Sequence, residues 1–550
     1  MPSSEPSVPH GPVIGRRAFL AGLVASAVAA GCSGGDDEAG LDSAGGPEGV
    51  PSETGADLPP VPSTLPAEVF TLGVASGDPL PDAVILWTRL VSDPLVDGGG
   101  LPDQPLPVRW EVATTDAFDD IVASGDTVAE PAFGHAVHVD ASGLEPATWY
   151  HYRFSVGEWT SPVGRTRTAP ARGDEVDRLR FAFASCQDQQ DGHWPVHRHI
   201  AGEQDLDLVV FLGDYIYEDE PDPSAMRPAH TPAPVDLAGY RRRYAEYKAD
   251  PALQAAHAAA PWICTWDDHE VQANYAGDVP GGEGRQAADD DGFRERRAAA
   301  YQAWYEHMPV RIEPPAGPDL DMTVYRSVRW GDLARFYVLD GRQYRSDQAC
   351  GRPSDLGATC ADVDDDDRTM LGRDQERWLG RALDEAGATW NVIAQQTIVS
   401  KITVPLGDVE ALNLDQWDGY PAARRRLVDQ LGAVDNPVVI TGDIHASGVG
   451  VITADPDDPT SAPVATELVG TSVSSPFADG LEDVVERSAA ASPAIRYVEA
   501  SRRGYVVCEV TPRELTADFR YVTTVATPEA PLGPGARWVV TEGDPEPRAG

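Results

Sequence analysis

Six short apolar segments between residues 179 and 441 most constrain how this chain can fold. Longer segments with helical periodicity lie between them, such as residues 236–248, 292–308 and 372–387. Strands that are apolar along their whole length and alternate with helices are typical of a sheet covered on both faces. The sequence therefore predicts an α/β domain over residues 175–525. The six segments are 179–185, 206–212, 262–266, 334–340, 390–395 and 437–441.

Residues 65–170 have a different pattern. Their apolar residues form short alternating runs separated by turn residues, and helical periodicity is absent. Such runs predict a β-sandwich of the fibronectin or immunoglobulin type in front of the α/β domain. The clearest runs are residues 84–90, 107–115, 135–142 and 148–156.

The first 32 residues resemble an export signal. Arg16 and Arg17 precede a short apolar stretch at 18–30, the arrangement of a twin-arginine (Tat) signal. Residues 29–32 resemble a lipobox that would make Cys32 a lipidated N-terminus, but Ala29 stands where Leu or Val is commoner, so the lipid anchor stays open. We expect export by the Tat machinery to a periplasmic, cell-surface or extracellular location, and contact with a membrane only through that anchor.

Two further segments are rich in Gly, Pro, Ser and acidic residues. Residues 33–64 contain almost nothing that could be buried, which predicts a disordered linker. Residues 526–550 have a similar composition and are predicted to form a flexible tail.

The chain is strongly acidic, with 43 basic and 88 acidic residues and a formal charge of −45. A surface of this charge repels polyanions, which argues against nucleic acid as the main ligand. It would suit divalent cations or a salty habitat, and simple solubility explains it equally well.

The six cysteines suggest different roles. Cys350 and Cys360 lie close together in a polar loop of an exported chain, so a disulfide between them is expected. Cys264 and Cys508 lie in apolar runs and are expected to be small core residues.

Polar side chains with metal-binding atoms follow four of the predicted strands. In open α/β sheets, ligands bind beyond the carboxyl ends of the strands. Each of these residues alone has an ordinary structural explanation, such as a turn or a helix cap, but four such strand ends can converge on one metal site. The residues are Cys186 after the first strand, Asp214 and Tyr217 after the second, Asp268, His269 and Asn274 after the third, and Asp443 and His445 after the last.

The donor atoms suit two kinds of metal ion. Thiolate, phenolate, carboxylate and imidazole groups suit ferric iron, whereas carboxylate and amide oxygens suit calcium or another hard divalent ion. Asp214 is best placed to bridge the two ions, because Tyr217 lies on one side of its loop.

At these residues the chain resembles the PhoD-like branch of the metallophosphoesterases, which are relatives of the purple acid phosphatases. The resemblance extends from about residue 66 to 525 and implies a catalytic αββα sandwich. It rests on GVASGDP, LWTR and VGRTRTAP before residue 171, and on FASCQ, GDYIYE, TWDDHE, LDGRQYR, GRDQERWL and TGDIHA after it.

The resemblance implies a ligand set. A ferric ion would be held by Cys186, Asp214, Tyr217 and His445. Calcium would be held by Asp214, Asp443 and either Asp268 or Asn274, two alternatives that the sequence leaves open. The family's VxxH motif is not evident, and residues 394–396 (AQQ) are the segment that could occupy its place.

The implied reaction is hydrolysis of phosphate monoesters or diesters by a metal-activated hydroxide, as in an alkaline phosphatase or phosphodiesterase. His269 would protonate the leaving alkoxide or steady the equatorial oxygens, and a structural role is its alternative. Arg342 and Arg345 would clamp phosphate or form surface salt bridges.

The rival functions are a phospholipase D-type headgroup hydrolase and a non-catalytic calcium-binding surface protein.

Overall fold

The computed structural model of the chain describes residues 58–60, 65, 68–203, 205–281, 290–316, 322–351, 356–357, 359–385, 387–406, 409–458, 460–477 and 480–550. The expected signal at 1–32, Cys32 and nearly all of the linker at 33–64 lie outside these residues. Within the described ranges, no helix has both the length and the apolarity needed to cross a bilayer.

A ten-stranded mixed sheet carries the first three predicted strands of the α/β domain. β9 (Leu179–Ala184), β10 (Leu208–Phe211) and β11 (Trp262–Cys264) are parallel neighbours in it. On one side the sheet continues through the antiparallel strands β22 (Gly504–Val510) and β23 (Glu514–Tyr521).

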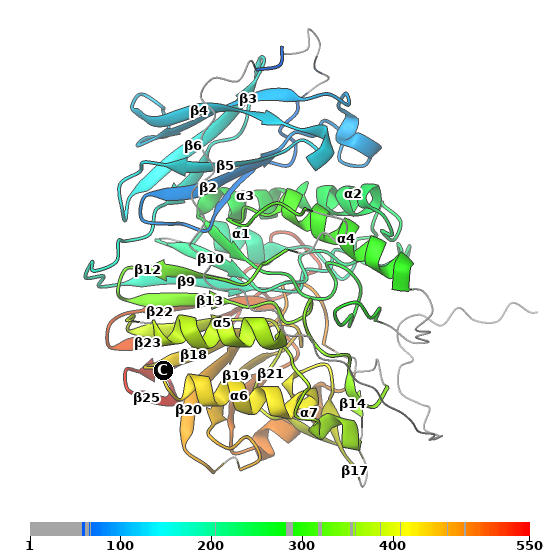
Figure 1. The fold of residues 1–550 in the computed structure, drawn as a ribbon, viewed down its shortest axis with the longest axis vertical. Helices are drawn as coiled ribbons and strands as arrows, with labels where there is room; N and C mark the ends of the chain where they lie inside the picture. Colours follow the sequence, from blue (N-terminus) through cyan, green and yellow to red (C-terminus); the bar gives the residue numbers. More distant parts are fainter. Residues whose placement is uncertain are drawn as a thin grey trace, which may run out of the picture. The chain divides into compact units, whose positions relative to one another are not determined.

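A seven-stranded sheet carries the other three predicted strands, which are parallel neighbours in its middle (Figure 1). Its strands in spatial order are β12 (Arg326–Trp330), β13 (Ala334–Val338), β15 (Trp390–Ala394), β18 (Pro437–Thr441), β20 (Pro463–Val469), β19 (Ser447–Thr453) and β21 (Ile495–Glu499). A smaller sheet contains β14 (Leu356–Gly357), β17 (Val409–Asn413) and β16 (Thr403–Leu406).

The two large sheets share one apolar core. Phe181 and Phe183 of β9 pack in it with Phe336 of β13 and Ile440 of β18. The alternate residues of β9, such as Ala182, face the other way, toward the helices, as the two-residue period of a strand requires. Burial on both faces explains why these strands are apolar throughout.

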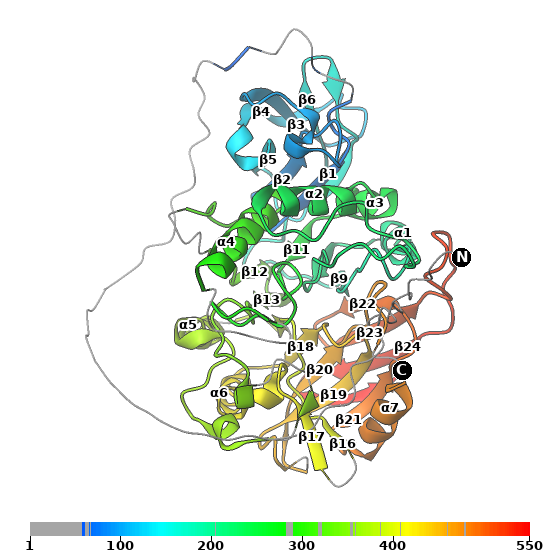
Figure 2. The same cartoon turned by 90° about the vertical axis from the view of Figure 1, so that its right-hand side faces the viewer.

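Helices cover the outer faces of both sheets (Figures 1 and 2). This arrangement agrees with the predicted α/β class. α1 (Pro195–Ala201), α2 (Leu237–Lys248), α3 (Pro251–Ala259) and α4 (Asp290–His307) belong to the ten-stranded side, α5 (Gly372–Asp384) and α6 (Pro421–Leu431) to the seven-stranded side, and α7 (Glu482–Ala491) lies near β21. Cys350 and Cys360 form a disulfide, and Cys264 and Cys508 are buried free thiols.

The N-terminal region is rich in strands, as predicted, but it is not separated from the rest of the chain. β1 (Val74–Gly77), β2 (Ala83–Arg89) and β5 (Ala136–Ser142) extend the ten-stranded sheet, because β1 pairs with β11. A second sheet packs against them through a common apolar core. It consists of β3 (Leu106–Ala113), β4 (Ile121–Ala129), β6 (Trp149–Val156), β7 (Trp159–Thr160) and β8 (Gly164–Arg167).

The prediction of a flexible tail at 526–550 is wrong. β24 (Ala536–Thr541) pairs with β23, and β25 (Asp544–Ala549) pairs with β24. Val540 is buried and Trp538 packs against the core between the large sheets. The Gly- and Pro-rich residues before this hairpin hid its short apolar strand, which satisfies the hydrogen-bonding edge of β23.

Substituting Gly77 should weaken the junction between β1 and β11. A Cβ atom at this position would lie 2.1 Å from the Pro309 carbonyl oxygen and 2.5 Å from that of Trp262. Because both are backbone atoms of packed elements, we expect Gly77→Ala to destabilise the protein by roughly 1–3 kcal/mol or more. Gly292→Ala is the control, since a Cβ atom there meets nothing within 4 Å. Equal thermal midpoints for the two variants in calorimetry would contradict the close junction.

Candidate metal centre

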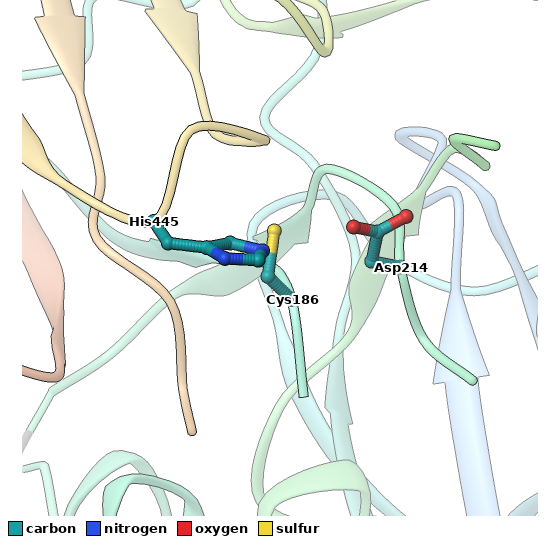
Figure 3. A group of neighbouring side chains, drawn as sticks. All are labelled: Cys186, Asp214 and His445. Atoms are coloured by element: carbon teal, nitrogen blue, oxygen red, sulfur yellow. The ribbon is translucent and has the colours of Figure 1, made fainter. Parts of the chain in front are cut away.

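Loops after strands of both sheets bring the predicted ligands together. Cys186 follows β9, Asp214 follows β10, and His445 follows β18 of the other sheet. The thiol sulfur, a carboxylate oxygen and a ring nitrogen of these three residues lie within 4.8 Å of one another. Figure 3 shows the three side chains reaching one point from separate loops. Sequence reasoning therefore identified residues that the fold places side by side.

Tyr217 completes this group. Its hydroxyl oxygen lies 3.0 Å from Asp214 Oδ2 and 3.1 Å from His445 Nε2. His445 Nδ1 donates a hydrogen bond to the Pro476 carbonyl oxygen at 2.8 Å, and burial lowers the pKa of its imidazole to about 4. The ring is therefore neutral near pH 7, with the Nε2 lone pair directed at the other ligands, which is the form that binds a metal.

A second group contains only carboxylates. Oxygens of Asp267, Asp268 and Asp443 lie within 4.8 Å of one another, and Asp268 also lies within that distance of Asp214 and His269. Asp268 thus connects the two groups. The sequence placed Asp267 in the polar segment that follows the third strand, but it was not among the ligands predicted individually.

Asn274, the alternative to Asp268, contributes through its backbone in the described contacts. Its N–H donates a hydrogen bond to Asp268 Oδ2 at 2.6 Å. Asp268 Oδ1 accepts no hydrogen bond, although it is buried. Arg342 Nη2 lies 3.3 Å from this oxygen, and Asp268 belongs to two of the groups that could hold a metal ion.

Burial and mutual repulsion disfavour the ionised forms of several groups in the site. Burial, reinforced by the neighbouring carboxylates, raises the pKa of Asp214 well above its usual range. Burial also raises the pKa of Asp267 and Asp443 and, together with Asp214, that of the Cys186 thiol. Groups that resist ionisation in this way are ionised only if positive charge lies next to them. The donor set therefore fits a metal centre, with sulfur and nitrogen in one group and only oxygen in the other.

Arg342 and Arg345 form salt bridges, as one of their two predicted roles requires, but these salt bridges are buried and not at the surface. The Arg342 side chain is 0% exposed, and its nitrogens contact Asp267, Asp415 at 2.7 Å, Asp443 at 3.0 Å and Asp268 at 3.3 Å. Arg345, equally buried, contacts Asp415 at 2.6 Å. Neither side chain lies at the surface, and binding of phosphate by either one stays a prediction. They provide positive charge that partly offsets the buried carboxylates.

His269 is held beside the first group. Its ring stacks on Tyr217 with 4.1 Å between centroids, and its Nδ1 lies 2.8 Å from Glu218 Oε2. Burial opposes protonation of the ring, but Glu218 and Asp214 outweigh it and raise the pKa of His269 well above its usual value. Sequence reasoning missed Glu218, whose role depends on a contact that spacing does not reveal.

Five candidate residues have a backbone conformation that is rare outside glycine. The φ angles are 60° at Cys186, 54° at Asp214, 57° at Asn274, 62° at Asp443 and 58° at His445. Such left-handed residues cost free energy and gather at functional sites, where the surrounding structure holds them. The backbone conformation of these loops therefore helps to orient the candidate side chains.

Glu270 fixes two of these loops. Its carboxylate accepts hydrogen bonds from the backbone N–H groups of Asp214 at 3.0 Å, Tyr215 at 2.6 Å and Asp267 at 2.7 Å. One buried side chain thereby sets the positions of both strand-end turns. The sequence showed Glu270 within the motif but gave it no role.

Two other structural residues support the centre. Ser475 Oγ lies 2.9 Å from the Tyr217 hydroxyl. Gln396, in the segment considered for the missing VxxH motif, donates to the Trp266 and Leu339 carbonyl oxygens at 2.7 and 2.9 Å. Gln396 therefore connects loops and does not stand in for a histidine ligand.

Comparisons with known proteins agree with this geometry. The family described as PhoD-like phosphatase matches residues 181–519, and the PhoD-like phosphatase N-terminal domain matches residues 57–170. Alkaline phosphatase D of Bacillus subtilis (strain 168) is 45% identical over 484 residues, which cover 86% of this chain and 80% of that protein.

The fold is also similar to that of a solved structure. A structure of PhoD superimposes with a TM-score of 0.82 and 41% identity, covering 88% of this chain and 93% of that one. A purple acid phosphatase from yellow lupin (Lupinus luteus) seeds gives a TM-score of 0.49 at 12% identity, covering 85% and 73% of the two chains, and this supports no further conclusion.

Replacing Glu270 by Gln should weaken the hydrogen bonds that hold the loops of Asp214 and Asp267. The amide keeps one acceptor oxygen and turns the other into a donor, so at least one buried N–H group loses its partner. We expect a loss of roughly 1–3 kcal/mol in unfolding free energy. Faster hydrogen exchange at residues 214, 215 and 267 should accompany it. Glu220→Gln, at an exposed position, is the control. Unchanged stability and exchange in Glu270→Gln would show that the carboxylate does not hold the loops.

Proposed function

The chain belongs to the PhoD-like phosphatase family, and from this membership we propose that it is a metal-dependent alkaline phosphatase or phosphodiesterase. One observation carries the proposal. A buried thiol, a buried phenol, a half-buried imidazole and several carboxylates meet at the ends of strands from two sheets. A phosphate ester is the substrate class that such a site in this family would hydrolyse.

We assign two metal ions to the two groups. Ferric iron would be held by Cys186, Asp214, Tyr217 and His445. Calcium would be held by Asp214, Asp268 and Asp443, with Asp267 beside them. The donor atoms of each group support its metal, because thiolate and phenolate favour iron and carboxylates favour calcium. When bound, the ions supply Lewis acidity that neutralises phosphate oxygens and acidifies water.

The chain's own residues would hold and move the proton. Glu218 occupies Nδ1 of His269, so Nε2 is the nitrogen available to donate a proton to the leaving oxygen. Glu218 and Asp214 outweigh the effect of burial and raise the pKa of this imidazole, which favours the protonated form that a general acid needs. Stacking on Tyr217 fixes the plane of the ring. His269 is thus the proposed general acid, with Glu218 as its positioning residue.

Export is a separate part of the proposal. Arg16, Arg17 and the apolar stretch behind them support passage through the Tat machinery to a periplasmic, cell-surface or extracellular location. Cys32 supports a lipid anchor as an additional element. The net charge of −45 supports small phosphate esters over nucleic acids as substrates.

Metal analysis combined with an assay on chromogenic phosphate monoesters and diesters tests the function. We expect iron and calcium in the purified enzyme, a visible charge-transfer colour from the Tyr217 phenolate, and loss of activity on chelation that calcium reverses. Relative rates on the two esters decide between phosphatase and phosphodiesterase. A folded protein that binds calcium but hydrolyses neither ester would favour the non-catalytic alternative.

Cys186→Ser should reduce iron content and turnover. The thiolate contributes negative charge and a strong bond, and even changes around the direct ligands of a metal typically cost 10–100-fold, so we expect about 100-fold or more. Cys508→Ser is the matched control, because Cys508 is also a buried free thiol but lies within β22. If both variants keep iron and turnover when normalised to folded protein, Cys186 is only a core residue.

His269→Ala should lower the rate of ester hydrolysis by a factor that depends on the leaving group. Loss of a general acid costs about 10²–10⁴-fold when the leaving alkoxide needs a proton, and much less when it does not. Rates on an alkyl phosphate and on p-nitrophenyl phosphate measure this difference, and Glu218→Gln should give a weaker version of it. Equal losses on both esters would assign His269 to phosphate binding instead of proton transfer.

A further inference from the structure

A second cavity of about 570 Å³ lies away from the metal centre. It is bounded by the beginning of β9, the end of α1, β23 and the loop after β23. Its lining residues are Arg178, Arg180, Arg198, His199, Gly202, Glu203, Asp205, Arg520 and Leu532. The family motifs quoted above include none of these residues.

The charge of this cavity is opposite to that of the chain. Four arginines and one histidine line it, against one glutamate and one aspartate. The whole chain has twice as many acidic as basic residues, 88 against 43. A concave surface with an excess of positive charge concentrates anions even where the net charge repels them.

Two of the arginines share one carboxylate and form the back of the cavity. Arg180 Nη2 contacts Glu203 Oε2 at 2.8 Å, and Arg520 contacts the other oxygen of the same carboxylate. The Tyr505 hydroxyl donates to Glu203 as well, at 2.6 Å. Glu203 thus holds both guanidinium groups in place.

The other two arginines are exposed and, among the described residues, are paired more loosely or not at all with carboxylates. Arg178 is exposed, and its nearest carboxylate oxygens are 3.8 and 3.9 Å away, on Glu509 and Asp205. Arg198 is exposed and donates to the Glu529 carbonyl oxygen at 3.1 Å. Within the described ranges, Arg198 has no carboxylate within ion-pair distance. Its guanidinium group keeps donors for an incoming anion.

The cavity and the metal centre lie at opposite ends of one strand. Arg178 and Arg180 flank the start of β9, whereas Cys186 follows its end. Six residues of extended chain separate them by about 20 Å. A ligand in the cavity is therefore not part of a small substrate bound at the centre.

We propose that this cavity binds a multiply charged oxyanion of the phosphate or sulfate class. Guanidinium groups pair with the oxygens of such anions through two parallel hydrogen bonds. The volume lies within the range of pockets that enclose small organic ligands, so a polyanion fits better than a single phosphate ion. The proposal does not depend on the reaction at the metal centre.

Calorimetric titration of the metal-loaded enzyme tests this site. The probes are inorganic phosphate and inositol hexakissulfate, a polyanion that a phosphatase cannot hydrolyse. We expect the hexakissulfate to bind more tightly than phosphate. The variant is Arg178→Gln combined with Arg198→Gln, two exposed positions where loss of folding is not expected. Arg377→Gln with Arg487→Gln, also exposed, removes the same charge elsewhere and is the control.

The expected result is at least about tenfold weaker binding of the hexakissulfate in the Arg178/Arg198 variant and unchanged binding in the control. Turnover of a phosphate ester should remain at the wild-type level in both. Equal weakening in variant and control would show a general charge effect and overturn the proposal, as would no binding to the wild type. Preference for phosphate over the polyanion would overturn the assignment of ligand size.

Discussion

The burial of many carboxylates around one point is the constraint on which the rest of this structure depends. Buried carboxylates are costly unless each finds positive charge or hydrogen-bond donors. Arg342 and Arg345 compensate Asp415, and Arg342 also contacts the carboxylates of the second group. Backbone N–H groups compensate Glu270, and His269 compensates Glu218. Cys186, Asp214 and Asp443 remain with raised pKa values, and additional positive charge next to them would favour their ionised forms. Every surrounding loop contributes to this balance.

The two large sheets stabilise the loops that contain left-handed residues. Ligands come from the ends of β9, β10 and β11 in one sheet and of β18 in the other, and Arg342 follows β13. The shared apolar core fixes these strand ends relative to each other, since close-packed side chains resist displacement. Left-handed residues such as Cys186 and Asp443 can then persist, because the packed strands determine where each loop begins. A single sheet would supply only one side of the site.

The features that could be predicted are those that a short stretch of sequence determines by itself. The strands could be found because burial on both faces makes them apolar, and the ligands because they directly follow those strands. The roles of Glu218, Ser475 and Gln396 were not predictable, since each depends on a contact with a residue distant in the chain. Arg342 was misinterpreted because its position after a strand does not show whether it faces solvent. The C-terminal hairpin was missed since β24 is short and follows a loop typical of disorder.

The raised pKa values also connect metal binding to the stability of the fold. A carboxyl such as Asp214 has a higher pKa in the metal-free folded chain than in the unfolded chain, so the folded state binds more protons. The contribution of such a carboxyl to the stability of the metal-free fold therefore falls as pH rises above its unfolded pKa of about 4. A metal ion reverses this sign, because it binds the ionised carboxylates of the folded state. Folding and metal loading are then coupled in the alkaline range, where the metal-free centre is weakest. A chain exported in the folded state would accordingly be most stable if it received its metal before export.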